Sequence, residues 1–250
     1  MPANRQNLYD NDEFFAGYAR ARENPLAMNY TVEQPGIRAL ITAEMIETAR
    51  ALDLGCGSGG FADWLVDGGA ESVLGVEPSS NMLVAARENP RPEIEFRQAF
   101  AEELELDDSQ FDLVVSSLMF HYIEDLKPVF EKIHSWLREG GSLVFSIEHP
   151  IAMSGQGKSP GWIKDKSGER VGWEVIDYSV EGERNSHWIV DGVVKYHRTI
   201  ATTMNMLVDS GFRIDRISEA HASPADELLD PGLVEERIRP PFLFVRAIAE

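Results

Sequence analysis

The sequence from Leu52 to Gly60 is LDLGCGSGG, and this stretch decides the fold. It ends a run of apolar residues typical of a buried strand and leads into a pattern typical of a helix. Its glycines allow the backbone to turn tightly and to approach a ligand without intervening side chains. The stretch therefore predicts a ligand-binding turn between a strand and a helix.

On both sides of this turn, short apolar runs alternate with helical patterns. Predicted strands span 49–54, 72–77, 94–97, 111–117 and 142–147, and predicted helices span 60–67, 79–88 and 126–138, the last of them stopping at Gly140-Gly141. A helix over 199–210 and strands over 212–218 and 242–248 extend the pattern. The order predicts an α/β fold: a Rossmann-like, seven-stranded, mostly parallel sheet with helices on both faces.

The pattern also divides the chain into parts. Residues 1–48 are predicted to form helices and loops before the first strand, and the core comprises 49–150 and 197–250. Residues 151–196 are rich in glycine, charge and aromatics, and they predict an inserted antiparallel flap. In this insertion, segments 188–190 and 193–196 flank Asp191-Gly192, a pair typical of a tight hairpin turn. Its aromatic side chains are predicted either to pack on each other or to contact a substrate.

Charge narrows the possible partners of the protein. The 250 residues contain 23 Lys and Arg against 42 Asp and Glu, a net charge of −19, which repels nucleic acids and anionic lipids. No apolar run is long enough to span a bilayer, and the first residues lack the apolar core of a signal peptide, so we expect a cytoplasmic location and no membrane partner. Cys56 is the single cysteine, and no thiolate metal site is predicted.

Two acidic residues near the glycine turn indicate the kind of ligand. Asp53 lies two positions before Gly55, where its carboxylate suits the ammonium of an amino-acid cofactor and would repel a pyrophosphate. Glu77 ends the next strand, near the spacing at which a carboxylate binds ribose hydroxyls. These carboxylates favour a cofactor with an amino-acid tail. Residues 55–60 also fit the dinucleotide fingerprint G-x-G-x-x-G, so a nicotinamide dinucleotide remains an alternative.

Further motifs follow in order along the chain. They are LDLGCGSG at 52–59, VEPS at 76–79, FDLVVSS at 111–117 and LREGGSL at 137–143. Together they resemble class I S-adenosylmethionine-dependent methyltransferases, and the resemblance is closest to the branch typified by ubiquinone and menaquinone biosynthesis. It covers roughly residues 49–150, with a weaker echo at 210–212. It implies S-adenosyl-L-methionine as the cofactor.

The resemblance also implies which residues bind that cofactor. Asp53 would serve its methionine end, Glu77 its ribose, and the segment before the first strand would cover it as a lid. At Phe100 the family usually has an acidic residue that contacts the adenine, so either Glu102 supplies this contact or Phe100 stacks on the ring. The full implied set is Tyr18, Asn29, Asp53, Gly55, Cys56, Gly57, Glu77, Pro78, Met82, Phe100, Ala101, Glu102, Ser117 and Leu118.

Methyl transfer is an in-line displacement, which requires an aligned nucleophile, exclusion of water and, for weak nucleophiles, a base. Base candidates at the carboxyl edge of the sheet are His121 and Tyr122 after the fourth strand, and Glu148 and His149 after the fifth. His149 is the first candidate. A hydrogen-bonded structural role is the alternative for His121 and His149.

The sequence thus predicts a methyltransferase that acts on an O, N or C atom of a small-molecule metabolite. The fourth strand ends in Ser116-Ser117-Leu118-Met119 and not in the Asn/Asp-Pro-Pro-aromatic motif of nucleobase-amine methyltransferases, so nucleic acids are not expected as partners. Two alternatives remain open, an NAD(P)-dependent oxidoreductase and a non-catalytic S-adenosylmethionine-binding protein. A monomer and a homodimer are both compatible with the sequence.

Overall fold

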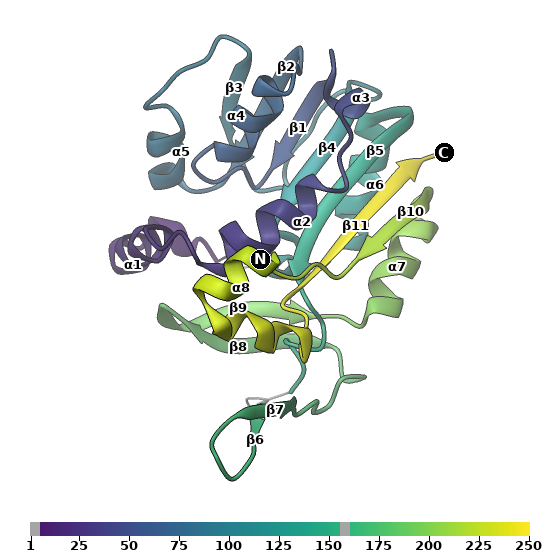
Figure 1. Ribbon diagram of the computed structural model, residues 1–250. Helices are drawn as coiled ribbons and strands as arrows, with labels where there is room; N and C mark the ends of the chain where they lie inside the picture. The colour runs from purple at the N-terminus through teal and green to yellow at the C-terminus, as the bar shows by residue number, and fades with distance from the viewer. Residues whose placement is uncertain (1–5, 156–160) are drawn as a thin grey trace.

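A seven-stranded sheet forms the centre of the computed structural model, which describes residues 6–155 and 161–250 (Figure 1). The strand order is β10-β11-β5-β4-β1-β2-β3. The strands are β1 Arg50–Leu54, β2 Ser72–Glu77, β3 Ile94–Gln98, β4 Phe111–Ser117, β5 Leu137–Glu148, β10 Phe212–Ser218 and β11 Phe242–Ala249. Strands β1 to β5 pair in parallel, and β11 runs antiparallel to both of its neighbours, β5 and β10. The predicted Rossmann-like α/β sheet is confirmed.

Helices cover both faces of the sheet because successive strand residues point to opposite sides. In β4, Val114 belongs to one apolar core cluster, whereas Leu113 and Val115 belong to the other. The first cluster lies under α6 Lys127–Trp136 and α7 Ile200–Asp209, and the second under α2 Gln34–Arg38, α3 Ala43–Ile46 and α4 Gly60–Asp67. The other helical elements that follow β1 are α5 Ser80–Ala86, η3 Phe120–Tyr122, α8 Pro224–Leu229 and η4 Pro231–Arg237.

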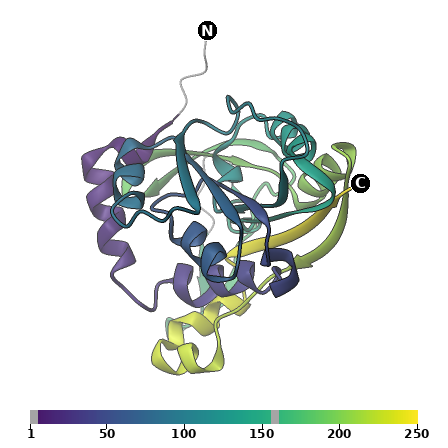
Figure 2. The same cartoon turned by 90° about the horizontal axis from the view of Figure 1, so that it is seen from above.

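The segment before β1 is helical and crosses the carboxyl ends of the strands. It contains η1 Leu8–Asp10, α1 Asp12–Arg22 and the π-helical turn η2 Asn29–Glu33, which continues into α2. The Asn11 side chain caps α1 by accepting a hydrogen bond from the backbone N–H of Phe14. Phe14 is fully buried, and its ring packs edge-on against Trp188. Helix α1 therefore packs against the inserted strands, as Figure 2 also shows.

The insertion forms two separate antiparallel ribbons. They are β6 Trp162–Lys164 with β7 Arg170–Trp173, which the sequence did not predict, and β8 Gly182–Trp188 with β9 Val190–His197. The turn predicted at Asp191-Gly192 is wrong, because Trp188 pairs with Val190 and the chain reverses at Ile189. Ile189 lies so close to α1 that a Cβ added to Gly17 would be 2.4 Å from its side chain. Packing of the ribbon tip on α1 thus overrides the local turn preference.

The predicted boundary between α6 and β5 is also wrong. Helix α6 ends at Trp136, and β5 begins at Leu137, which pairs with Phe111 of β4. Gly140 has a positive φ of 78°, and the register of the ladder shifts next to Phe111. The two glycines therefore form an irregularity inside a long strand and not a helix stop.

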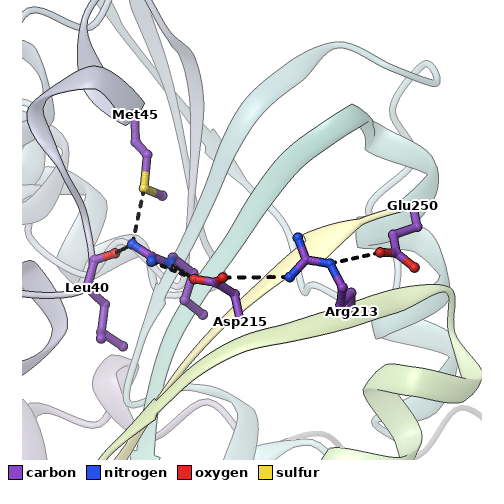
Figure 3. A network of polar contacts seen from close by, with 6 residues as sticks. Leu40, Met45, Arg213, Asp215 and Glu250 are labelled. Carbon is purple, nitrogen blue, oxygen red and sulfur yellow. Dashed lines mark hydrogen bonds and ion pairs between the residues drawn. The ribbon is translucent and has the colours of Figure 1, made fainter.

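Arg246 of β11 ties the N-terminal helices to the edge of the sheet, through a polar network in which Figure 3 labels Leu40, Met45 and Asp215. Its guanidinium donates to the Asp215 carboxylate of β10 at 2.6 Å and to the backbone carbonyl of Leu40 at 2.8 Å. The Arg246 side chain is only 17% exposed, whereas Arg213, which also pairs with Asp215, is 52% exposed.

Within the part of the chain that the structure describes, no helix is both long and apolar enough to cross a membrane.

Replacement of Arg246 by Met should lower the free energy of unfolding by about 1–3 kcal/mol, because charge-assisted hydrogen bonds on both sides are lost. Methionine keeps most of the apolar stem, so packing changes little. Urea unfolding followed by circular dichroism measures the effect. Arg213→Met is the matched control and should cost about 0.5 kcal/mol or less, because its ion pair is exposed and screened. Equal losses in the two variants would contradict this account.

Candidate functional site

A cavity of about 1400 Å³ lies at the carboxyl ends of the parallel strands. Strand-end residues Asp53, Glu77, Ser117 and Glu148 line it, and this is the edge at which open α/β sheets bind ligands. The N-terminal helices and the β8–β9 ribbon contribute the opposite walls. Its volume exceeds the range of about 300–1,000 Å³ that is typical of one bound ligand, so a cofactor and a second molecule fit together.

The glycine turn forms one wall of this cavity. The backbone N–H groups of Gly55 and Cys56 both donate to the Val76 carbonyl, at 2.8 and 3.0 Å. Gly55 and Gly57 have φ values of 82° and 54°, in the left-handed region that favours glycine. A Cβ added to Gly57 would meet no atom within 4 Å, so a ligand can approach the backbone there.

Two buried carboxylates lie beside the turn, Asp53 at 1% and Glu77 at 6% exposure. Glu77 accepts backbone hydrogen bonds from Ser79 at 3.0 Å and Gly57 at 3.1 Å, yet its burial still raises its pKa. Asp53 Oδ2 is buried without a partner. Burial, followed by the negative charge of Glu77, raises the pKa of Asp53 to about 7. This oxygen can therefore accept a hydrogen bond from a cationic or donor group of a ligand.

Arg38 is a cavity residue that the sequence analysis missed. Its guanidinium lies over the rings of Trp64 at 4.9 Å and Phe61 at 5.7 Å, beside the first turns of α4. The buried Nε atom has no hydrogen-bond partner. Burial lowers the pKa of Arg38, and Glu33 opposes this shift. In the sequence, the only sign of this role is a single arginine in a short helical segment. That sign does not show where the guanidinium points.

Glu33, also missed, joins the N-terminal helices to the sheet. It is fully buried, and one carboxylate oxygen accepts from Asn29 at 3.0 Å and Gln34 at 2.8 Å. The other oxygen accepts from Ser117 at 2.8 Å and Ser146 at 2.5 Å. Asn29 and Ser117, both expected at the cofactor, are thus brought together through this carboxylate.

A second contact holds the N-terminal segment over α5. One oxygen of Asp10 accepts from the Ser79 hydroxyl at 2.8 Å, the Ser80 hydroxyl at 3.1 Å and the backbone N–H of Asn81 at 3.1 Å. Burial would raise the pKa of Asp10, but these hydrogen bonds, with the Asn81 N–H first, lower it. The first turn of α5 is therefore capped by a residue of the N-terminal segment.

The other end of the cavity contains a polar group around Glu148. His121 Nδ1 accepts a hydrogen bond from the backbone N–H of Glu148 at 3.4 Å, and burial lowers the pKa of His121 to about 4. Glu148 forms a short hydrogen-bonded ion pair with Lys195 of β9. Burial by itself raises the pKa of Glu148, but His121 and Lys195 outweigh it and lower the pKa. Burial also raises the pKa of Tyr122.

His149, the first candidate for the base, lies outside this cavity. Its Nε2 is 2.8 Å from the Glu219 carboxylate, and its Nδ1 accepts from the backbone N–H of Ile151 at 3.2 Å. Both ring nitrogens are therefore engaged in structural contacts, and the ring is fully buried. Because side chains alternate along an extended chain, Glu148 faces the cavity and the next residue faces away. The hypothesis that His149 is the base is not retained.

The other residues singled out from the sequence all line the cavity, including His121 and Tyr122. Phe100 and Glu102 both lie along it, so either can contact an adenine there. The cofactor candidates that line the cavity are Tyr18, Asn29, Asp53, Gly55, Cys56, Gly57, Glu77, Pro78, Met82, Phe100, Ala101, Glu102, Ser117 and Leu118.

Known proteins resemble this chain over most of its length. Residues 52–145 match the family model described as a methyltransferase domain. An S-adenosylmethionine dependent methyltransferase from Mesorhizobium loti, known from a crystal structure, is 41% identical in sequence. The match covers 89% of this chain and 98% of that chain, and the two structures superpose with a TM-score of 0.80. An uncharacterized protein of Haemophilus influenzae is 33% identical over 98% of this chain and 97% of its own length.

A shorter match falls in the branch that the motifs resemble. The ubiquinone biosynthesis O-methyltransferase of Alkalilimnicola ehrlichii is 31% identical over 127 residues, which are 49% of this chain and 48% of that protein. The cavity suits the cofactor of these enzymes. Asp53 has a buried oxygen without a partner, which fits an ammonium, and Arg38 has a buried nitrogen without a partner, which fits a carboxylate.

The affinity for S-adenosylhomocysteine should fall below about pH 7. Asp53 is raised to a pKa of about 7, so the ligand-free protein must release a proton before the carboxylate can pair with the ligand ammonium. Each pH unit below that value then weakens binding by up to about tenfold. Calorimetry between pH 5 and 7 measures this.

The Asp53→Asn variant cannot release that proton. Its affinity should be lower at pH 7 and nearly constant from pH 5 to 7. A pH profile as steep as that of the wild type would show that a different group titrates.

Proposed function

The chain belongs to the class I S-adenosylmethionine-dependent methyltransferases, and we propose that its acceptor is an O, N or C atom of a small-molecule metabolite, methylated by in-line displacement. The observation that carries this proposal is the size and lining of the cavity. The cavity of about 1400 Å³ includes the turn and the acidic residues beside it, and it extends past them to Tyr122, Trp188 and Phe242, an apolar and aromatic region suited to a small organic molecule.

In this proposal the β1 and β2 ends hold the cofactor. Asp53 accepts from the ammonium and Arg38 pairs with the carboxylate of the methionine tail. Each Glu77 oxygen already accepts one backbone N–H and has a second lone pair for a ribose hydroxyl. The bound cofactor supplies a methyl group on a sulfonium centre. We further propose that residues 1–48 act as a lid and that 151–196 act as the substrate flap.

The residues after β4 and β5 then align the acceptor. His121 is neutral at pH 7 because its pKa is about 4, and its Nδ1 already accepts a hydrogen bond, so the proton lies on Nε2. Tyr122 keeps its phenolic proton because burial raises its pKa. We propose that these side chains position the acceptor and exclude water, which is the main requirement of methyl transfer.

We propose no nucleic-acid partner, on the net charge of −19, and a cytoplasmic site of action. The nicotinamide alternative is not retained, because Asp53 would lie next to a pyrophosphate and repel it.

Incubation with methyl-labelled S-adenosylmethionine and a cell extract tests the proposed acceptor class. The extract is first divided by ultrafiltration into a low-mass filtrate and a macromolecular retentate. We expect label to appear in a low-mass product of the filtrate, identified by mass spectrometry. Label confined to protein or nucleic acid in the retentate would contradict the proposal, as would bound cofactor with no transfer to either fraction.

Substitution of the proposed cofactor residues tests the site. Arg38→Met and Glu77→Gln should each weaken S-adenosylhomocysteine binding about ten- to hundredfold, because each removes a charge-assisted hydrogen bond. Calorimetry at pH 7.5 measures the dissociation constants. Arg213→Met removes an arginine on the far edge of the sheet and should leave affinity unchanged. Wild-type affinity in Arg38→Met or Glu77→Gln would remove that residue from the site.

A further inference from the structure

The polar group around Glu148 lies apart from the residues proposed to bind the cofactor. It lies at the β4 and β5 end of the cavity, whereas Glu77 and the adenine stretch lie at the β2 and β3 end. Strand β1, which bears Asp53, is between them in the sheet. If the cofactor occupies the β1 to β3 side, as proposed above, the acceptor occupies the side of Glu148.

Lys195 reaches this place from the inserted ribbon. It is only 6% exposed, and its ammonium pairs with Glu148 while lying 5.9 Å from the ring of Tyr122 and 5.6 Å from that of Trp188. Tyr122, Trp188 and Glu148 line the cavity, but Lys195 is behind them. A buried ammonium is tolerated only when paired, so Lys195 and Glu148 each hold the other in place.

The two charges of the Glu148–Lys195 pair balance each other. Glu148 is the negative group, Lys195 is the positive group next to it, and His121 is neutral. Glu148 Oε1 binds Lys195, and no described residue pairs with Oε2 of this cavity-lining carboxylate. A charged acceptor would leave an uncompensated charge in this apolar chamber, whereas a neutral hydrogen-bond donor would use the second oxygen.

We infer that Glu148 and Lys195 form the polar anchor of the acceptor subsite, and that the acceptor is an uncharged, flat, mostly apolar molecule whose hydroxyl or N–H donates to Glu148. Tyr18, Tyr122 and Trp188 provide the aromatic walls for its ring. Glu148 would contact the acceptor directly, and Lys195 would act as a positioning residue through Glu148. The inference rests on the proposed function and adds the class of acceptor.

The assignment makes the insertion responsible for acceptor selection. Removal of Glu148 or of Lys195 should change whether the subsite prefers a neutral, an anionic or a cationic ligand. In Glu148→Gln the positive charge of Lys195 is no longer balanced, and Arg239 and Arg198 add to it, since both act electrostatically on this group. In Lys195→Met the carboxylate of Glu148 is left alone.

Three ligands with one ring system test this: 2-naphthol, 2-naphthoate and 2-naphthylmethylammonium. Each is titrated by calorimetry into the protein saturated with S-adenosylhomocysteine at pH 7. In the wild type, 2-naphthol should bind at least about tenfold more tightly than either ion, because it alone pairs with Glu148 without adding charge. Glu148→Gln should instead prefer 2-naphthoate, and Lys195→Met should prefer 2-naphthylmethylammonium.

Controls separate this inference from the proposed function and from misfolding. Arg170→Met removes a charged residue of the insertion that pairs with Glu235 of η4, and it should keep the wild-type order of the ligands. Lys195→Arg retains the positive charge and should restore the preference for 2-naphthol. All variants should bind S-adenosylhomocysteine within about twofold of the wild type, because Glu148, Lys195 and Arg170 do not lie on the cofactor side.

Two kinds of result overturn the assignment. One is a wild type that binds none of the three ligands, or that binds 2-naphthoate or 2-naphthylmethylammonium as tightly as 2-naphthol, while S-adenosylhomocysteine still binds. The other is an unchanged order of ligands in both Glu148→Gln and Lys195→Met. Failure of the wild type to bind S-adenosylhomocysteine would instead contradict the proposed function.

Discussion

The burial of Asp53 and Glu77 at the ends of two neighbouring strands is the constraint on which the site depends. Burial raises the pKa of both carboxyl groups, the negative charge of Glu77 raises the pKa of Asp53 further, and the fold offsets the cost of burial unequally. Glu77 accepts two backbone N–H groups, one of them from the glycine turn, so it also shapes that turn. Asp53 keeps a buried oxygen without a partner. A fold that retains such a group is poised to bind a cationic or donor ligand.

The positive charges that complement this acidic site come from outside the central sheet. Arg38 belongs to the helices before β1, and Lys195 belongs to the ribbon inserted after β5. Both lie over aromatic rings, which lets a cation remain partly buried in a chain whose net charge is −19. The core thus provides carboxylates at its strand ends, and the segments added to it provide the cations. In this account the strand ends and Arg38 select the cofactor, while the inserted ribbon selects the acceptor.

The sequence predicted the sheet and the residues that line the cavity around the glycine turn, because both depend on local patterns. Strand alternation and the glycine turn are readable within a few residues, and Asp53 and Glu77 are located by their spacing from that turn. Arg38, Glu33 and Lys195 were missed because their importance lies in contacts with distant residues, such as the Ser117 and Ser146 hydroxyls that bind Glu33. The preference for His149 failed for a related reason: which face a residue takes at a strand end depends on register.

A crystal structure of the protein with S-adenosylhomocysteine tests the central claim most directly. The account predicts that the ligand amino group lies within hydrogen-bond distance of Asp53, its ribose hydroxyls at Glu77 and its sulfur toward the β4 and β5 end that contains Glu148. Empty space should then remain beside Trp188. A ligand bound with its adenine at Glu148, or with Asp53 Oδ2 left without a partner, would contradict the account.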